Sequence, residues 1–159
     1  MSEKYHEFAP CGCLDSFSDQ ETDFIKEYQY WFLVLNIRQE FLGRSLLMLK
    51  AHKTDEVELS DEEALEKHHI YKAWRKAVDI AFTPDKVNQM QAGNDEVLHH
   101  GHLHWHFIPR YRRPVSFEGM TFFDDTPETQ SKPTTKLDVK FAVPVSVRAK
   151  IRDTLLVHL

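Results

Sequence analysis

Three histidines alternate with apolar residues in the stretch HLHWHF, residues 102–107. Successive side chains of a β-strand point to opposite faces, so a strand here would put His102, His104 and His106 on one face. The apolar residues between them would face a core. Three imidazoles in a row are not an ordinary surface, because protonated neighbours repel and apolar partners leave ring nitrogens unsatisfied. The pattern therefore indicates a chemical site.

Clustered histidines can serve three chemistries. His102 and His104 could share a zinc ion, although catalytic zinc sites usually take a third ligand from another element. A neutral imidazole, with a pKa of about 6.5, can act as a general acid or base. An imidazole can also attack phosphorus while its neighbours bind the phosphoryl oxygens, and His104, flanked on both sides, meets that geometry.

Length and composition limit the class of protein. The chain has 159 residues, of which 42% are hydrophobic, so we expect a single domain over residues 1–159. Its net charge of -5 argues against a general nucleic-acid binder. No apolar run is long enough to cross a membrane and the N-terminus has no apolar signal core, which favours a cytoplasmic protein without a membrane partner.

The first half of the chain shows a helix and a hairpin. Residues 1–14 have no periodicity and are expected to be an irregular arm, followed by a helix from Ser16 or Ser18 to about Tyr28. Residues 30–37 and 45–50 have the composition of buried strands, joined through a polar turn with Gly43 as its hinge. A short connection predicts that the two strands are antiparallel.

A long helix leads to the histidine strand. Ser60 and Glu63 have the spacing of a capping box, and apolar residues follow at three- and four-residue intervals as far as Phe82, before Pro84. Residues 86–91 form a weakly signalled strand, and residues 92–101 form a loop.

The remaining chain carries a hairpin about Glu118-Gly119, a polar loop over residues 124–136 and a last helix opened by Pro144. Together these elements predict an α+β fold. We expect a mainly antiparallel sheet of about five strands, with the long helix packed on one face and a C-terminal helix.

The alternating histidines resemble the signature of the histidine triad (HIT) family of nucleotide hydrolases and transferases. Residues 109–110, Pro-Arg, extend the resemblance to the branch that hydrolyses dinucleoside polyphosphates. Residues 33–36 with 43–52 resemble the family's first hairpin, and residues 60–63 resemble the start of its long helix. The likeness covers residues 30–113, and it implies a HIT-like fold and a homodimer formed through that helix and a shared sheet.

The resemblance implies a role for each member of the triad. His104 matches the nucleophile, which forms a nucleotidyl-histidine intermediate. His102 matches the histidine that holds the site together, and His106 the one that donates to the phosphate. A backbone carbonyl at the other nitrogen of His104 would fix its tautomer.

Residues outside the triad also match family positions. Asn36 matches the residue that holds the ribose hydroxyls, Gln91 the amide that contacts phosphate, and His99 a residue that assists the leaving group. His52 matches a further histidine, behind the triad, that is found in some relatives. At a strand end, turn chemistry is the alternative role for Asn36.

Three features depart from the family pattern. Arg44 stands after Gly43 in place of the usual histidine, and Val97-Leu98 replaces a Gly-Gln pair. The C-terminal extension, residues 111–159, resembles only one bacterial branch. Cys11 and Cys13 are too close in sequence to form a disulfide that stabilises the fold. They could join His52 and a second histidine in a structural zinc site, although their spacing is shorter than usual.

We expect a nucleotide hydrolase that cleaves a phosphoanhydride, as in diadenosine tetraphosphate, or a phosphoramidate. The triad mechanism implies no cofactor and no metal at the phosphate. One alternative is a zinc-dependent hydrolase that uses the histidines as ligands. The other is a non-catalytic nucleotide-binding protein, which would bind AMP without turnover.

Overall fold

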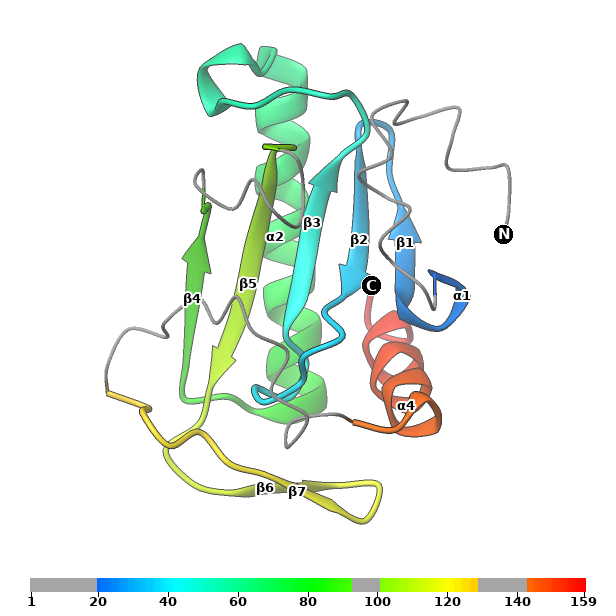
Figure 1. The fold of residues 1–159 in the computed structure, drawn as a ribbon, viewed down its shortest axis with the longest axis vertical. Coiled ribbons are helices and arrows are strands. Elements are labelled where there is room, and N and C mark those ends of the chain that lie inside the picture. The colour runs from blue at the N-terminus through cyan, green and yellow to red at the C-terminus, as the bar shows by residue number, and fades with distance from the viewer. Residues whose placement is uncertain (1–19, 93–100, 129–142) are drawn as a thin grey trace.

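The computed structural model describes residues 20–92, 101–128 and 143–159. Five strands form one antiparallel sheet in the order β1-β2-β3-β5-β4, and a separate two-stranded hairpin, β6–β7, lies beyond its lower end (Figure 1). The elements in chain order are α1 (Gln20–Asp23), β1 (Phe24–Glu27), β2 (Trp31–Leu35), β3 (Ser45–Leu49), η2 (Glu56–Glu58), α2 (Asp61–Phe82), β4 (Lys86–Met90), β5 (His104–Arg110), β6 (Val115–Phe117), β7 (Met120–Phe122) and α4 (Val145–Leu156). This architecture confirms the predicted α+β fold.

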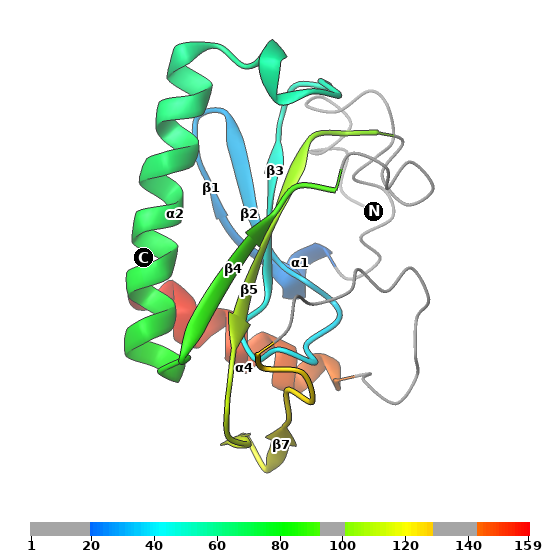
Figure 2. The same ribbon diagram turned by 90° about the vertical axis from the view of Figure 1, so that its left-hand side faces the viewer.

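The long helix α2 begins and ends where the sequence predicts. The Glu63 amide donates to Ser60 Oγ at 3.2 Å and the Ser60 amide to Glu63 Oε2 at 2.7 Å, which completes the capping box. The helix ends at Phe82, followed by Thr83 with a φ of +48°. Figure 2 shows α2 running along one face of the sheet.

A continuous apolar core lies between α2 and that face of the sheet. Trp74 of α2 is fully buried, its ring centroid lies 4.9 Å from that of Phe107, and its Nε1 donates to Ser45 Oγ at 3.0 Å. Trp31 reaches the start of the helix, where its Nε1 donates to the Glu63 carbonyl oxygen at 2.9 Å. The opposite face of the sheet is therefore the one left for a site.

The prediction of a helix through Tyr28 is wrong. The helix α1 stops at Asp23, and Phe24–Glu27 form an edge strand whose Phe24 pairs with Val34 and whose Glu27 pairs with Phe32. Ile25 is buried in the core, so pairing with β2 satisfies the backbone and buries an apolar side chain at once. The predicted arm over residues 1–14 lies outside the described residues.

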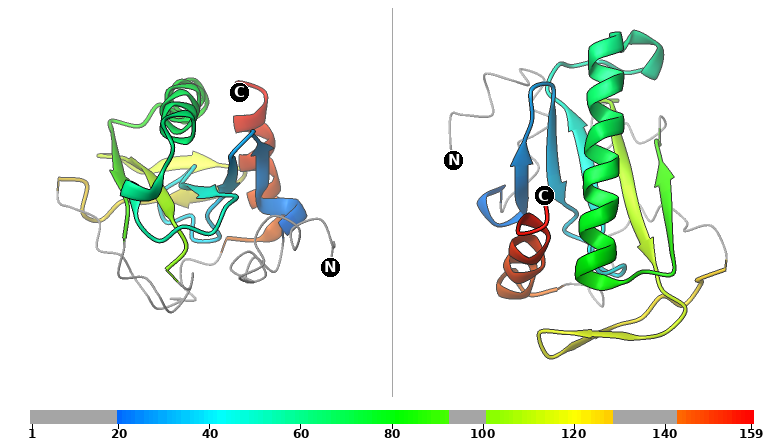
Figure 3. Two further views of the ribbon diagram at one scale, coloured as in Figure 1. Left: turned by 90° about the horizontal axis from the view of Figure 1, so that it is seen from above. Right: turned by 180° about the vertical axis from the view of Figure 1, so that it is seen from behind.

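The C-terminal helix α4 packs against the β1 end of the sheet (Figure 3). It begins at Val145, directly after Pro144, as predicted. Ile151 and Leu155 are fully buried in the core, and Arg148 Nε donates to Asp23 Oδ1 at 2.9 Å. Within the described ranges, no helix combines the length and apolar character that a membrane crossing needs.

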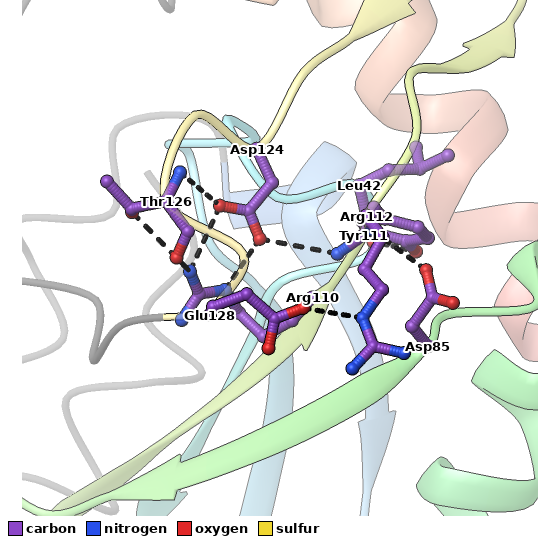
Figure 4. A network of polar contacts seen from close by, with 8 residues as sticks. All are labelled: Leu42, Asp85, Arg110, Tyr111, Arg112, Asp124, Thr126 and Glu128. Carbon is purple, nitrogen blue, oxygen red and sulfur yellow. Dashed lines mark hydrogen bonds and ion pairs between the residues drawn. The ribbon is translucent and has the colours of Figure 1, made fainter.

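The predicted hairpin about Glu118-Gly119 is confirmed, and both turn residues have positive φ. After it, the chain is fastened to the end of β5 by a buried ion pair (Figure 4). Arg110 Nε donates to Asp124 Oδ2 at 2.7 Å, and Arg110 Nη2 also donates to the Thr126 carbonyl oxygen. Asp124 is thus buried, although the sequence places it in a polar loop.

Candidate active site

His104 and His106 lie on the sheet face opposite α2. In the antiparallel register, His104 pairs with Met48 of β3 and His106 with Leu46. The residues between and after them, Trp105 and Phe107, belong to the core under α2. The alternation read from the sequence therefore holds along β5.

His102 comes just before β5, which begins at His104 rather than at His102. Two backbone bonds of Leu103 nevertheless keep this segment beside the chain that follows β3. The Leu103 amide donates to the Lys53 carbonyl oxygen at 2.8 Å, and the Leu49 amide donates to the Leu103 carbonyl oxygen at 3.3 Å. His102 is buried. Main-chain pairing therefore positions His104 and His106 directly, and it positions His102 through its neighbour Leu103.

The tautomer of His104 follows from its hydrogen-bond partners. Its Nδ1 lies 2.8 Å from the His102 carbonyl oxygen, which can only accept, so Nδ1 carries the proton. In the neutral ring Nε2 then holds the lone pair. This is the backbone carbonyl that the sequence analysis expects at the second nitrogen of His104.

The lone pair of His104 is directed at His106. The two Nε2 atoms lie 3.2 Å apart, and the rings cross at 71° with centroids 4.9 Å apart. Because neutral His104 has no proton on Nε2, His106 must supply the proton of this contact from its own Nε2. The pair thus combines an unprotonated nitrogen with a neighbouring N–H donor.

His102 connects the triad to His52 and to β3. Its Nε2 lies 2.6 Å from the Leu49 carbonyl oxygen and therefore donates, which leaves Nδ1 to accept from His52 Nδ1 at 3.2 Å. Burial lowers the pKa of His102; the bond to Leu49 opposes this shift, and the charges of His52 and His104 add to it. A neutral ring with a hydrogen bond at each nitrogen holds His102 in place, and with it the His102 carbonyl oxygen that accepts from His104.

Arg44 is a buried cation beside the triad, and its sequence position alone predicted no role for it. Its Nη2 lies 3.5 Å from His106 Nδ1, and its Nη1 forms an ion pair with Glu40. Desolvation lowers the pKa of Arg44, and the charge of Glu40 opposes that shift. The only sequence signal was that residue 44 departs from the pattern that the family resemblance implies after Gly43.

The turn between β2 and β3 is organised by a second residue without a sequence signal, Gln39. This fully buried side chain donates from Nε2 to the carbonyl oxygens of Asn36 at 2.5 Å and Arg44 at 2.7 Å. Its Oε1 accepts from the Gly43 amide at 2.9 Å. Gln39 therefore fixes the path of the chain into Arg44.

Asn36 and Gln91 are placed less directly. The Oδ1 of Asn36 accepts from the Arg38 amide at 2.8 Å, which is turn chemistry, and this contact uses only the oxygen of the carboxamide. Gln91 is exposed and comes directly after β4, whose last residue, Met90, pairs with His106. His99, Cys11 and Cys13 lie outside the described residues.

Zinc ligation was the other possible use of the histidines. Within residues 20–92, 101–128 and 143–159, no group of three or more His, Cys, Asp or Glu side chains is arranged to hold a metal ion. The suggested zinc site of Cys11, Cys13 and His52 stays a prediction, because two of its ligands are not described.

No protein-family model matches this sequence, and no curated protein matches it either. Solved structures do match. A histidine triad protein from Sinorhizobium meliloti has a TM-score of 0.66 and 16% identity, covering 89% of this chain and 94% of that one. A zinc-bound histidine triad family protein from Mycobacterium smegmatis has a TM-score of 0.59 and 18% identity, covering 93% of this chain and 91% of that one.

A diadenosine triphosphate hydrolase from Plasmodium falciparum, solved with cyclomarin A, has a TM-score of 0.58 and 12% identity. The match covers 98% of this chain and 95% of that one. Identities this low establish the fold alone. The chain has the fold of the histidine triad proteins.

Proposed function

We propose that this chain is a histidine triad enzyme that hydrolyses a nucleotide through a nucleotidyl-histidine intermediate. The bond cleaved is a phosphoanhydride or a phosphoramidate, and dinucleoside polyphosphates are the leading substrate class. One observation carries the proposal: His104 Nδ1 is bonded to the His102 carbonyl oxygen at 2.8 Å, and its Nε2 faces the Nε2 of His106 at 3.2 Å. This is a neutral nucleophile with a donor beside it.

In the first step His104 Nε2 attacks the α-phosphorus, and the bond from phosphorus to the leaving group breaks. The positive charge that develops on the ring is stabilised through Nδ1–H by the His102 carbonyl oxygen. The Nε2–H of His106 turns from His104 to a phosphoryl oxygen, where negative charge accumulates in the transition state. The leaving phosphate takes its proton from His99 or from water.

In the second step water attacks the same phosphorus and gives up one proton to the solvent, and the electron pair of the breaking P–N bond returns to His104 Nε2. A nucleoside monophosphate leaves, and His104 regains its lone pair. Asn36 is assigned to the ribose hydroxyls and Gln91 to the phosphate chain, on the family resemblance. Asn36 comes directly after β2, and its backbone amide donates to the carbonyl oxygen of Arg44, the residue whose side chain contacts His106, at 2.9 Å.

A homodimer is part of the proposal. The exposed side of α2 carries Leu65, 57% exposed, and Ile80, 55% exposed, and β4 is an edge strand of the sheet. Large apolar side chains on a helix beside an open strand edge support association of two copies through the helix and the sheet.

The test is His104→Ala, assayed on a panel of dinucleoside polyphosphates and adenosine phosphoramidates. The wild-type protein should release AMP and, after acid quenching, show the mass of a nucleotidyl adduct on the peptide that contains His104. The variant should lose about 10⁴-fold or more in kcat. Its unfolding midpoint should stay near that of the wild type, because the ring faces the site rather than the core. His158→Ala, which removes an exposed histidine, is the control.

Three other outcomes would reject the proposal. Turnover retained in the His104 variant would show that His104 is not the nucleophile. Activity lost to a chelator, without any adduct, would favour the zinc hydrolase. Binding of AMP without release of product from any substrate in the panel would favour a non-catalytic nucleotide-binding protein.

A further inference from the structure

Arg44 is placed to control which nitrogen of His106 carries the proton. It stands just before β3, two residues from Leu46, the partner of His106 in the register. Residues two apart on an extended chain share a face, so Arg44 lies on the histidine side of the sheet. Its Nη2 reaches to 3.5 Å from His106 Nδ1.

The direction of that contact is set by chemistry. A guanidinium has donors and no acceptor, so the nitrogen that faces it must carry a lone pair. A proton on His106 Nδ1 would point at a cation. In the neutral ring the proton is therefore on Nε2, and Nε2 is the atom that faces His104.

We propose that Arg44, held by Glu40, is a positioning residue that fixes His106 in the Nε2–H tautomer, so that this ring can donate to the phosphoryl oxygens. Its catalytic value rests on the function proposed above for the triad. The titratable and charged groups in contact with His106 include His104 on its own strand and Arg44, paired with Glu40, from the turn before β3. From β4 the partner is Met90, which does not titrate.

The cost of the Arg44–Glu40 pair argues for a role in the site. The side chains of Arg44 and Glu40 are only 7% and 13% exposed. Arg44 Nε and Glu40 Oε2 are buried without a hydrogen-bond partner among the described residues. Burying an ion pair gains little net stability, and unsatisfied buried groups lower it. The pair is therefore not explained by a contribution to stability, whereas its contact with His106 gives it a role in the site.

The identity of the residue also matters. The resemblance places a histidine at position 44 in relatives, and a histidine could donate or accept and would titrate near neutral pH. Arginine only donates and stays charged. In this chain the contact that orients His106 therefore does not depend on the protonation of residue 44.

The experiment compares Arg44→Met and Arg44→Lys with the wild-type chain by ¹⁵N NMR of the histidine side chains at pH 7.5. The wild-type His106 signals should have the pattern of a ring protonated at Nε2. In Arg44→Met the Nδ1–H form should become populated beside the Nε2–H form, which the contact with His104 still favours, and Arg44→Lys should restore the wild-type pattern in part. The matched control is Arg75→Met, which breaks an i,i+4 ion pair with Asp79 on α2, on the other side of the sheet.

The kinetic readout separates positioning from binding. Arg44→Met should lower kcat by about 10- to 100-fold, since a positioned proton donor is lost. KM should stay within about threefold, because the arginine is not assigned to the substrate. Arg44→Lys should recover part of kcat.

The two proposals fail in different ways. If His106 in Arg44→Met keeps the Nε2–H pattern, the inference about Arg44 is wrong, whatever the activity. If the wild type releases no monophosphate, the proposed function is wrong, while the NMR comparison still decides the role of Arg44. Should Arg44→Met fail to fold, Glu40→Gln combined with Arg44→Met removes both buried charges and allows the same comparison.

Discussion

At the scale of single residues, backbone carbonyls decide the protonation of the site. The Leu49 carbonyl oxygen receives the proton of His102 Nε2, and the His102 carbonyl oxygen receives that of His104 Nδ1. Neither carbonyl can donate, so each ring is left with one defined lone pair. The orientation of two imidazoles is thus a property of the main chain, which side-chain substitutions around the site do not easily disturb.

The burial of His102 predicts an acid-sensitive fold. In the unfolded chain this ring titrates near a pKa of about 6.5. In the folded chain desolvation lowers its pKa, so below 6.5 the unfolded state binds a proton that the folded state does not. The contribution of His102 to the free energy of unfolding is therefore complete above that pH and is lost as the pH falls toward the lowered value.

Urea unfolding between pH 7.5 and 5.5 measures this effect. The wild type should lose more stability over that interval than His102→Asn, which can still donate to Leu49 but does not titrate. Equal losses in the two proteins would mean that the acid sensitivity comes from other groups.

A glycine pair offers a test of close packing under the turn. Gly43 has a φ of +84°, and a Cβ there would lie 2.9 Å from Phe82 Cδ2. Gly119 has a φ of +75°, but a Cβ there would meet nothing within 4 Å. Both alanine substitutions strain the backbone by about 1–2 kcal/mol. Only Gly43→Ala adds a clash with a core ring, which costs roughly a further 1–3 kcal/mol.

Thermal or urea unfolding of the two variants isolates that difference. Gly43→Ala should be the less stable by the amount of the clash. Equal stabilities would show that Phe82 moves aside freely, and the turn before Arg44 would then be less rigid than its packing indicates.

The triad could be read from the sequence because its information is local. Alternation with apolar residues places the rings, and the carbonyl of His102 is only two residues from His104. Arg44 could not be assigned, because its partner His106 lies 62 positions away along the chain. Gln39 could not be assigned either, because its partners are backbone groups of a turn whose conformation the sequence does not reveal. Asn36 could be placed at a strand end, but its contact with the Arg38 amide depends on that same turn.

At the scale of elements, a buried ion pair joins β5 to the chain after the β6–β7 hairpin (Figure 4). Arg110 and Asp124 are almost fully buried, and two bonds at 2.7 and 3.0 Å link them. The Arg110 guanidinium also lies over the Phe41 ring, 4.9 Å from its centroid. This cluster supports the turn between β2 and β3, because Phe41 belongs to the segment of that turn that leads into Arg44.

Breaking this ion pair from one side should be costly. Asp124→Asn leaves the Arg110 charge buried without a counter-ion, and should lower the free energy of unfolding by about 3–5 kcal/mol. Replacing both residues, Arg110→Met with Asp124→Leu, should cost less than the single change, because no charge is left uncompensated. A double variant less stable than Asp124→Asn would contradict this, as measured by urea unfolding.

The element that was not predicted from the sequence, β1, is defined by its pairing with another strand. The weak strand before the histidines was correctly predicted to within one residue, because β4 has a strand sequence and a neighbour close along the chain. The edge strand β1 was assigned to a helix, since four residues carry too little periodicity. Only its pairing with β2 identifies it, and that pairing depends on the whole sheet.

At the scale of the whole molecule, the proposed homodimer depends on the exposed apolar side chains of α2. The combined variant Leu65→Glu and Ile80→Glu puts like charges on both helices of such an interface, and should convert a dimer to a monomer. Sedimentation should give twice the chain mass of 18.8 kDa for the wild type and a single chain mass for the variant.

Val157→Glu is the control, because Val157 is 80% exposed and lies after α4, on a different element from Leu65 and Ile80. It should keep the wild-type mass. A wild-type protein that sediments as a single chain at micromolar concentration would rule out this part of the proposal.

The contact between Asp23 and Arg148 spans 125 positions of the chain, and Lys26 Nζ donates to the Leu159 carbonyl oxygen across 133. One side of the sheet is thus closed by residues that are synthesised at least 125 positions after their partners. While those residues are still inside the exit tunnel, Asp23 lacks its ion pair with Arg148 and β1 lacks its contact with α4. A nascent chain that has emerged from the tunnel only as far as residue 142 should therefore be cleaved readily by protease near Asp23, and emergence of α4 should protect it.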